Sequence, residues 1–253
     1  CVLKPYDSSG GIEIYHADCR EVIPHLPEID VVLTDPPYSD VTHEGARTGG
    51  YGEIVLVDFD SVTPEFLRDT YSMIAPKLKS WLVAFMDWQH IAYLKDHTPD
   101  GLRFVRFGIW VKPNGAPQFT GDRPGQGWEG IGIFHREGGK MSWNGGGRHA
   151  VFTYNKINGS HPTEKPLPLV SELVSLFSNP GDLIFDPFMG SGTTLRAAKN
   201  LGRRAIGCEI NEAYCEVAAR KLQQEVLFAE VGLRPRDCVS SGGFETKPLS
   251  SST

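Results

Sequence analysis

Two short segments, each at the carboxyl end of a predicted strand, carry residues that could do chemistry, and we expect them to converge on one cleft. The first, Asp35-Pro36-Pro37-Tyr38, directly follows an apolar run. Its two prolines have fixed φ angles and no N–H donors, so they hold a carboxylate and an aromatic ring in a stiff arrangement. Asp35 and the Pro36 carbonyl can accept hydrogen bonds from the amino group of a planar ring while Tyr38 stacks on that ring, a contact worth about 1–3 kcal/mol for a nucleobase. The alternative is a packing turn in which Tyr38 is half-buried.

The second segment, residues 183–194, runs from an apolar strand through a glycine-rich turn into a helix. Gly190 and Gly192 allow a ligand to approach the backbone closely, and the following helix N-terminus presents free N–H groups. The segment is neither a Walker loop nor a full dinucleotide-binding fingerprint. Glu209 ends the next strand about 20 residues on, where such an acid accepts from ribose hydroxyls. A solvated strand end, or an ion pair with Arg203 or Arg204, is the alternative for Glu209.

Short apolar runs alternate with helical patterns and must position these segments. Some of the runs are apolar on both faces, which is typical of strands buried between two helix layers. The predicted strands are 12–15, 30–34, 81–87, 102–112, 130–135, 183–186 and 204–209, and the predicted helices are 64–78, 166–178, 192–201 and 212–228. Thr63 and Asn211 are N-cap signals, and Tyr214, Ala218, Leu222 and Val226 form one apolar stripe. The alternation predicts a doubly wound α/β sheet.

Two stretches interrupt the alternation. Residues 39–60 are polar and glycine-containing, and residues 113–160 are rich in Gly, Pro and Asn, so both are predicted to be long loops, which are often functional. Residues 103–165 carry nine Lys or Arg and four acids, whereas the whole chain has a net charge of −6. A basic segment on an acidic body indicates either a local nucleic-acid face or a solvated loop region. The tail from about residue 232 is predicted to be unstructured.

Composition places the chain among ordinary globular proteins. It has 253 residues, of which 40% are hydrophobic and 22% charged. Its longest apolar run, residues 81–86, is far shorter than the roughly 20 residues that span a bilayer. Five cysteines without a CxxC pair or a metal-like spacing favour free thiols in a reducing compartment such as the cytoplasm. The chain begins with Cys1 and not with Met, which indicates a fragment or a processed chain.

In their order along the chain, these motifs resemble the amino-group DNA methyltransferases, which use S-adenosylmethionine (AdoMet). Asp35-Pro36-Pro37-Tyr38 resembles the catalytic DPPY motif of this family, and the segment 188–192 (Phe-Met-Gly-Ser-Gly) resembles its AdoMet loop. The segment 161–166 (His-Pro-Thr-Glu-Lys-Pro) is similar to the HPTxKP motif, and residues 16–19 also fit the pattern. The catalytic motif precedes the glycine loop, as in the circularly permuted β group, and the resemblance covers roughly residues 10–228.

The resemblance implies a role for each matching residue. Phe188, Gly190, Ser191, Gly192 and Thr193 would surround the methionine part of AdoMet. Asp186 would lie near its amino group, and Thr163 and Lys165 near its carboxylate. Glu209 would accept hydrogen bonds from the ribose hydroxyls, and Asp18 and Cys19 would lie beside the adenine. Asp35 is expected to serve both the cofactor and the target amine. Asp18 as a helix N-cap and Cys19 as a core residue are the alternatives, and Lys165 has the weakest claim because loop lysines are usually solvated.

The resemblance also implies a fold, a substrate and a partner. One mostly parallel Rossmann-like domain would span residues 1–228, with 113–160 as a short irregular recognition insert and 229–253 as a flexible tail. Asp at the first motif position favours N6 of adenine in double-stranded DNA, flipped out of the helix, over N4 of cytosine. Neither a metal nor a membrane is expected. Either the DNA sequence that is recognised is short, or a homodimer or an accessory subunit supplies further contacts with DNA. The candidate DNA contacts are Arg123, Arg136, Lys140, Arg148 and Lys156.

Other functions remain open from the sequence. RNA or protein amine methyltransferases usually carry Asn before Pro-Pro-Tyr and place it after the glycine loop, opposite to the order here. A non-catalytic AdoMet-binding subunit would not need an intact Asp35-Pro36-Pro37-Tyr38. A nucleotide-dependent oxidoreductase would share the fold but would leave that motif unexplained.

Overall fold

The predicted apolar runs form the strands of one sheet. The computed structural model describes residues 4–37, 62–115, 117–118, 120–157 and 164–223. The strands are β1 (Asp7–Ser9), β2 (Ile12–His16), β3 (Ile29–Thr34), β4 (Leu78–Met86), β5 (Leu102–Val111), β6 (Trp128–Arg136), β7 (Val151–Thr153), β8 (Leu183–Asp186) and β9 (Arg204–Glu209). All seven predicted strands are confirmed within a few residues. The short strands β1 and β7 lie outside those predictions.

The sheet is mixed but mostly parallel. Among the described residues its strand order is β1-β2-β9-β8-β3-β4-β6-β5-β7. The neighbours from β2 to β4 are parallel, and β6 runs antiparallel to both β4 and β5. The order reverses direction in sequence between β8 and β3, and open α/β sheets bind ligands beyond the carboxyl ends of strands at such a point.

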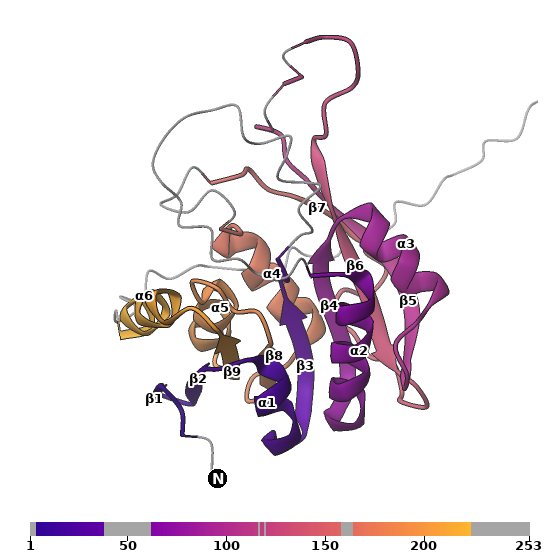
Figure 1. The fold of residues 1–253 in the computed structure, drawn as a ribbon. Coiled ribbons are helices and arrows are strands. Elements are labelled where there is room, and N and C mark those ends of the chain that lie inside the picture. The colour runs from indigo at the N-terminus through magenta and orange to yellow at the C-terminus, as the bar shows by residue number, and fades with distance from the viewer. Residues whose placement is uncertain (1–3, 38–61, 116, 119, 158–163, 224–253) are drawn as a thin grey trace, which may run out of the picture.

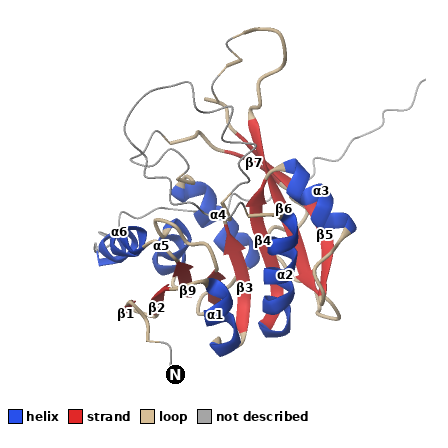
Figure 2. Cartoon of the chain, in the orientation of Figure 1, coloured by secondary structure: helices blue, strands red, loops and turns tan. Residues whose placement is uncertain are grey.

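Helices cover both faces of this sheet (Figure 1). The helices are α1 (Cys19–Val22), α2 (Pro64–Ile74), α3 (Trp88–Asp96), α4 (Leu167–Phe177), α5 (Thr193–Asn200) and α6 (Glu212–Gln223), with 3-10 turns at Ile23–His25 and Ala75–Lys77. One buried cluster joins the sheet to α4, α5 and α6, and a second joins it to α1, α2 and α3. Figure 2 shows the sheet between these two helix layers. The predicted doubly wound α/β fold is therefore confirmed.

Local signals in the sequence explain where the helices begin. The Thr63 hydroxyl accepts from the Phe66 N–H at 3.1 Å, and the Asn211 side chain accepts from the Ala213 N–H at 2.9 Å. Both predicted N-caps are confirmed. In α6 the side chains of Ala218 and Leu222 are buried as the stripe predicts, while Val226 lies outside the described residues.

The 113–160 segment is not one continuous irregular loop. Its middle is β6, whose residues are almost all buried and which pairs with β4 on one side and β5 on the other. The apolar alternation around residues 130–135 outweighs the glycines, because a buried strand between two partners needs little side-chain bulk at Gly130 and Gly132. The described residues between β5 and β6 and between β6 and β7 are irregular. The predicted loop at 39–60 and the tail lie outside the described residues.

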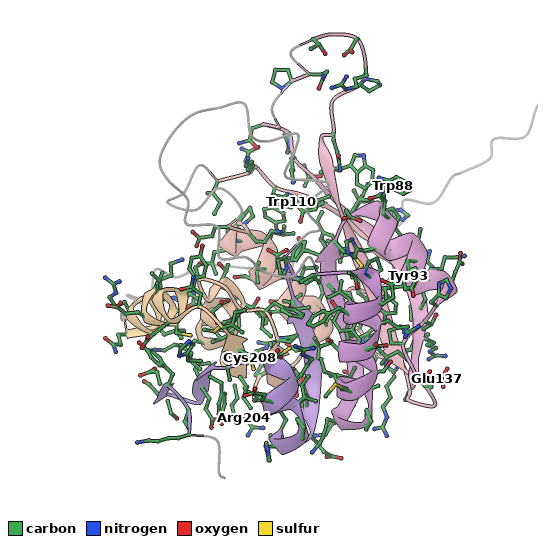
Figure 3. All side chains as sticks on the ribbon, viewed as in Figure 1. Trp88, Tyr93, Trp110, Glu137, Arg204 and Cys208 are labelled. Carbon is green, nitrogen blue, oxygen red and sulfur yellow. The ribbon has the colours of Figure 1, made fainter. Side chains whose placement is uncertain are left out.

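Strand directions define two edges of the sheet. Strands β3, β8 and β9 end at one edge, which is called here the carboxyl edge, and β4 ends there as well because it is parallel to β3. Strand β6 runs the other way, so Gly130 lies beside Met86 at the carboxyl edge and His135 lies beside Trp81 at the opposite edge. Figure 3 shows the same separation: Trp88, just after β4, and Glu137, just after β6, lie at opposite ends of the sheet.

Candidate active site

Asp35 and the glycine turn that follows β8 lie together at the carboxyl edge of the sheet. Asp35 follows β3, the glycine turn follows β8, and both line one pocket together with Phe85, Lys165 and Asp186. The cavity volume of this pocket is about 90 Å³, which is below the roughly 300–1,000 Å³ typical of small-molecule sites. The other lining residues are Glu164, Val170, Phe188, Met189, Gly190, Ser191, Thr193, Thr194 and Tyr214. The sequence-based prediction that these distant segments share one site is borne out by this pocket.

The glycine turn has the backbone conformation that its sequence indicates. Gly190 and Gly192 have φ angles of +49° and +82°, in the region that favours glycine. A Cβ at Gly192 would lie 2.8 Å from the Ala218 Cβ of α6, so this glycine also lets α6 pack closely. A Cβ at Gly190 would meet no protein atom within 4 Å. The turn therefore offers an open backbone surface to the pocket at Gly190.

Asp186 is a buried carboxyl group at the floor of the pocket. Its side chain is 2% exposed and accepts from the Thr34 hydroxyl at 2.7 Å and from the Phe188 N–H at 3.1 Å. Burial raises the pKa of Asp186 to about 7, although the hydrogen bond from Thr34 acts to lower it. A cationic amino group bound nearby would favour the ionised form.

Glu209 is held in place by the turn beside it. Its two carboxylate oxygens accept from the backbone N–H groups of Gly190, at 3.1 Å, and Asn211, at 2.8 Å. Burial raises the pKa of Glu209, while these hydrogen bonds lower it. Arg203 and Arg204 donate to other groups, so in the described structure Glu209 is oriented by backbone amides and not by an arginine.

Asp18 and Cys19 adopt the local roles considered as alternatives. The Asp18 carboxylate accepts from the Arg20 N–H at 2.8 Å as the N-cap of α1, and it pairs with the Arg20 guanidinium at 2.5 Å. Cys19 is buried, and burial raises the pKa of its thiol to about 12. Neither residue lines the pocket around Asp35. Phe188, which does, packs against the same cluster as Cys19.

Lys165 is not solvated, contrary to what is usual for a loop lysine. Its side chain is 6% exposed, and its ammonium lies 2.6 Å from Asp35 Oδ2 and 3.0 Å from Glu129 Oε1. Burial by itself lowers the pKa of Lys165, but the two carboxylates outweigh burial and raise it. The ammonium also lies 5.1 Å from the centre of the Phe85 ring. The sequence-based reason for giving Lys165 the weakest claim was therefore wrong.

Asp35 shares this environment. Its side chain is 29% exposed to the pocket. Burial raises the pKa of Asp35 to about 6, while the ammonium of Lys165 lowers it. Pro36 is buried behind Asp35 and Pro37 is exposed. Tyr38 and Thr163, two of the predicted site residues, lie outside the described residues.

Glu129 is the site residue that the sequence interpretation missed. It lies in β6 opposite Trp110, is 8% exposed, and bridges Lys165 to Lys112, whose ammonium is 2.7 Å from Glu129 Oε2. In the sequence it was only one of four acids in a basic segment. An acid at the start of an otherwise apolar strand was the signal that could have indicated a buried, paired carboxylate.

The five candidate DNA contacts are not on one face. Arg123 lies in the β5–β6 connection at the carboxyl edge, and the Lys156 backbone is tied to that connection through the Asn114 side chain. Arg136 and Lys140 lie at or near the end of β6, so the structure places them toward the opposite edge. Arg148 pairs with Glu172 of α4 at 2.5 Å. Arg123 and Lys156 therefore lie in stretches at the carboxyl edge, whereas β6 carries Arg136 and Lys140 away from that edge.

Two further observations concern partners. In the described part of the chain, no group of three or more His, Cys, Asp or Glu side chains is arranged to hold a metal ion. None of the described helices is long and apolar enough to cross a membrane. The described cysteines, Cys19, Cys208 and Cys215, are free and buried.

The chain is similar in sequence and fold to AdoMet-dependent DNA methyltransferases. Residues 138–220 match the family model described as DNA methylase. The Type II methyltransferase M2.DpnII of Streptococcus pneumoniae is 26% identical, over 88% of this chain and 94% of the relative. The chain is therefore similar to the N6-adenine/N4-cytosine DNA methyltransferases in sequence.

Solved structures agree with this assignment. The M1.HpyAVI–SAM complex is 28% identical, with a TM-score of 0.67 over 84% of this chain and all of the other. PvuII DNA methyltransferase, described as cytosine-N4-specific, has a TM-score of 0.69 at 17% identity, over 89% of this chain and 91% of the other. At 17% identity, the similarity to PvuII DNA methyltransferase shows a shared fold and nothing more.

Proposed function

We propose that this protein transfers the methyl group of AdoMet to the exocyclic N6 of adenine in double-stranded DNA. The observation that carries the proposal is the shared pocket, in which the Asp35 carboxylate and the glycine turn at Gly190 line the same space. A methyl donor held by the turn and an amine held by Asp35 would therefore be neighbours. Holding two reactants in this way removes much of the entropic barrier to their reaction.

The residues of the turn fit the polar groups of AdoMet. Asp186 is a buried carboxyl group suited to the cationic amino group, and Glu209, whose carboxylate is held by two backbone N–H groups, would accept hydrogen bonds from the ribose hydroxyls. Phe188, Ser191 and Thr193 line the same pocket. AdoMet supplies an electrophilic sulfonium methyl group, and the protein supplies position and charge. We further propose that Asp18 and Cys19 lie at the adenine end and Thr163 near the carboxylate.

Asp35 and the Pro36 carbonyl would act on the target amine as hydrogen-bond acceptors. The lone pair of an exocyclic amine is delocalised into its ring, so the amine is a poor nucleophile. Hydrogen bonds from its N–H groups to two acceptors favour a nitrogen with an available lone pair. The same acceptors stabilise the positive charge that develops on nitrogen, which is preorganised electrostatic catalysis. The base must leave the duplex to reach them, and we propose that Tyr38 stacks on the flipped base.

Adenine is the proposed target because Asp occupies the first position of the Asp35-Pro36-Pro37-Tyr38 motif. N4-cytosine is the second candidate, since both amines could present N–H donors to the same acceptors. PvuII DNA methyltransferase, which shares the fold, is described as cytosine-N4-specific. Methylation of RNA or protein, and a non-catalytic role, have no comparable support from the pocket.

We propose that DNA approaches the carboxyl edge over the β5–β6 connection and the stretch that follows β7. Arg123 is exposed in the first connection, and Lys156 is exposed in the stretch that follows β7. Because these stretches are short, we propose that a second protomer or an accessory chain extends the contact with DNA. An activity that rises with the square of protein concentration at low concentration would support a dimer.

Incubation with methyl-tritiated AdoMet and mixed-sequence DNA tests the proposal. After digestion to nucleosides, we expect the label in N6-methyladenine. Label in N4-methylcytosine would support the second candidate. Label in RNA or protein substrates, with none in DNA, would contradict the proposed substrate, and no transfer to any of them would contradict the proposed activity.

A further inference from the structure

Four charged side chains form a line of alternating sign that ends at Asp35. The line runs from Lys112, just after β5, to Glu129 in β6, then to Lys165 before α4, and ends at Asp35 after β3. The successive nitrogen–oxygen distances are 2.7, 3.0 and 2.6 Å. Glu129 and Lys165 are almost fully buried, at 8% and 6% exposed. Three segments of the fold thus each contribute one charged side chain to a row of ion pairs that ends at the Asp35 carboxylate.

Such a set is costly to bury unless it is paired, and here each inner charge has two opposite neighbours. Removing one member of a buried pair is strongly destabilising, because it leaves an uncompensated buried charge. Aromatic rings support both lysines, since the ammonium of Lys112 lies 4.5 Å from the Trp110 ring centre and that of Lys165 lies 5.1 Å from the Phe85 ring centre. The four charges sum to zero beside the pocket.

The position of this line matters for the proposed reaction. Positive charge develops on the target nitrogen during methyl transfer, and an unbalanced ammonium at Lys165 would oppose it. Glu129 balances that ammonium at 3.0 Å. Lys165 in turn donates to one oxygen of Asp35 and leaves the other for the amine.

We propose that Lys165 and Glu129 are positioning residues for methyl transfer: Lys165 holds the Asp35 carboxylate ionised and in place, and Glu129 holds Lys165 and balances its charge. This inference rests on the proposed function of Asp35. It differs from the role that the family resemblance implies for Lys165, which is contact with the carboxylate of AdoMet.

Loss of Lys165 and loss of Glu129 are expected to shift the pH dependence of methyl transfer in opposite directions. The groups that act electrostatically on Asp35 include Lys165 and Lys112, which lower its pKa, and Glu129, which raises it; Asp35 also interacts with buried Asp186 and Tyr71. Methyl transfer needs ionised Asp35. The fall of the methyl-transfer rate at low pH, the acid limb of the pH–rate profile, therefore reports the ionisation of Asp35. Lys165→Met is expected to move that limb to higher pH, by about 1–3 pH units for loss of a close opposite charge. Glu129→Gln is expected to move it to lower pH.

The experiment measures single-turnover methyl transfer to DNA from pH 5 to 9, together with AdoMet affinity by calorimetry. Glu129→Gln is also expected to lower the plateau rate, by roughly 10- to 100-fold, which is less than the loss expected for a group that touches the reacting atoms. AdoMet affinity should stay near the wild-type value in both variants. Lys79→Met is the matched control, because Lys79 also lies near two carboxylates, Asp30 and Glu28, but toward the opposite edge.

Each outcome separates this inference from the proposed function. No transfer by the wild-type protein would contradict the proposed function itself. An active wild-type protein whose two variants shift in the same direction, or not at all, would overturn the inference. Weakened AdoMet binding by Lys165→Met with an unchanged acid limb would instead support a cofactor contact. If Lys165→Met does not fold, Lys112→Met replaces it, with an expected shift opposite to that of Glu129→Gln.

Discussion

At the scale of single residues, the site is a set of carboxyl groups in different environments. Asp35 faces an ammonium, Asp186 faces a hydroxyl and a backbone N–H, and Glu209 faces two backbone N–H groups. Burial raises the pKa of all three, but only Asp35 has a buried cation beside it. These environments suit three different partners: an amine donor, a cationic amino group and ribose hydroxyls.

Replacement of Asp35 separates catalysis from cofactor binding. Asp35→Ala removes the main acceptor for the target amine, so methyl transfer should fall by at least about 100-fold. AdoMet affinity, measured by calorimetry, should change only a few-fold because the glycine turn, Asp186 and Glu209 remain. A variant that keeps its activity would contradict the role given to Asp35.

Asp186 should make the stability of the protein depend on pH. The pKa of its buried carboxyl is raised to about 7 in the folded state, above the ordinary value of 3.8. The folded state therefore binds more protons than the unfolded state between about pH 4 and pH 7, so this group lowers the free energy of unfolding as pH rises through that window. Urea unfolding of Asp186→Asn should show a flatter pH dependence than the wild-type protein. An equally steep dependence would show that other groups cause it.

At the scale of elements, the sequence predicts best where a pattern is long or a cap is local. The strands β8 and β9 and the start of α2 match their predicted bounds because apolar runs and N-cap residues are local signals. The strand β7 has three residues and α1 has four, too few for any period to be read. The nine-residue α3 was missed because its apolar residues are interrupted by polar and charged ones.

The glycine turn gives a prediction about two neighbouring positions. Gly192→Ala should lower the free energy of unfolding by more than the roughly 1–3 kcal/mol of backbone strain, because its Cβ would also lie 2.8 Å from the Cβ of Ala218. Gly190→Ala should cost only the strain, since no protein atom lies within 4 Å, but it should weaken AdoMet binding. Urea unfolding and calorimetry on both variants check this. A larger loss of stability at Gly190 would contradict the geometry.

At the scale of the whole molecule, the shared pocket could be predicted from the sequence but the charged line could not. Strand ends of a parallel sheet meet at one edge, so Asp35 and the glycine turn were expected together. Burial of Lys165 depends on β6 lying between β4 and β5, which no local pattern contains. For the same reason the sequence grouped Arg123 with Arg136, although β6 separates them.

The arrangement of basic residues gives a prediction for DNA binding. Arg123→Ala and Lys156→Ala should each weaken DNA affinity and reduce the slope of log affinity against log salt by about 1 if each contacts a phosphate. Arg136→Ala and Lys140→Ala should leave both quantities near the wild-type values, because these residues lie away from the carboxyl edge. Fluorescence anisotropy with duplex DNA at several salt concentrations measures both. Equal losses in the two pairs would contradict the proposed DNA face.

The central claim is that methyl donor and target amine meet in the pocket between Asp35 and the glycine turn. A crystal structure of the protein with AdoMet tests it most directly. We expect the methionine part of the ligand against Gly190 and Asp186, with its methyl group directed toward the Asp35 carboxylate. AdoMet bound elsewhere, or bound with its methyl group turned away from Asp35, would contradict the account.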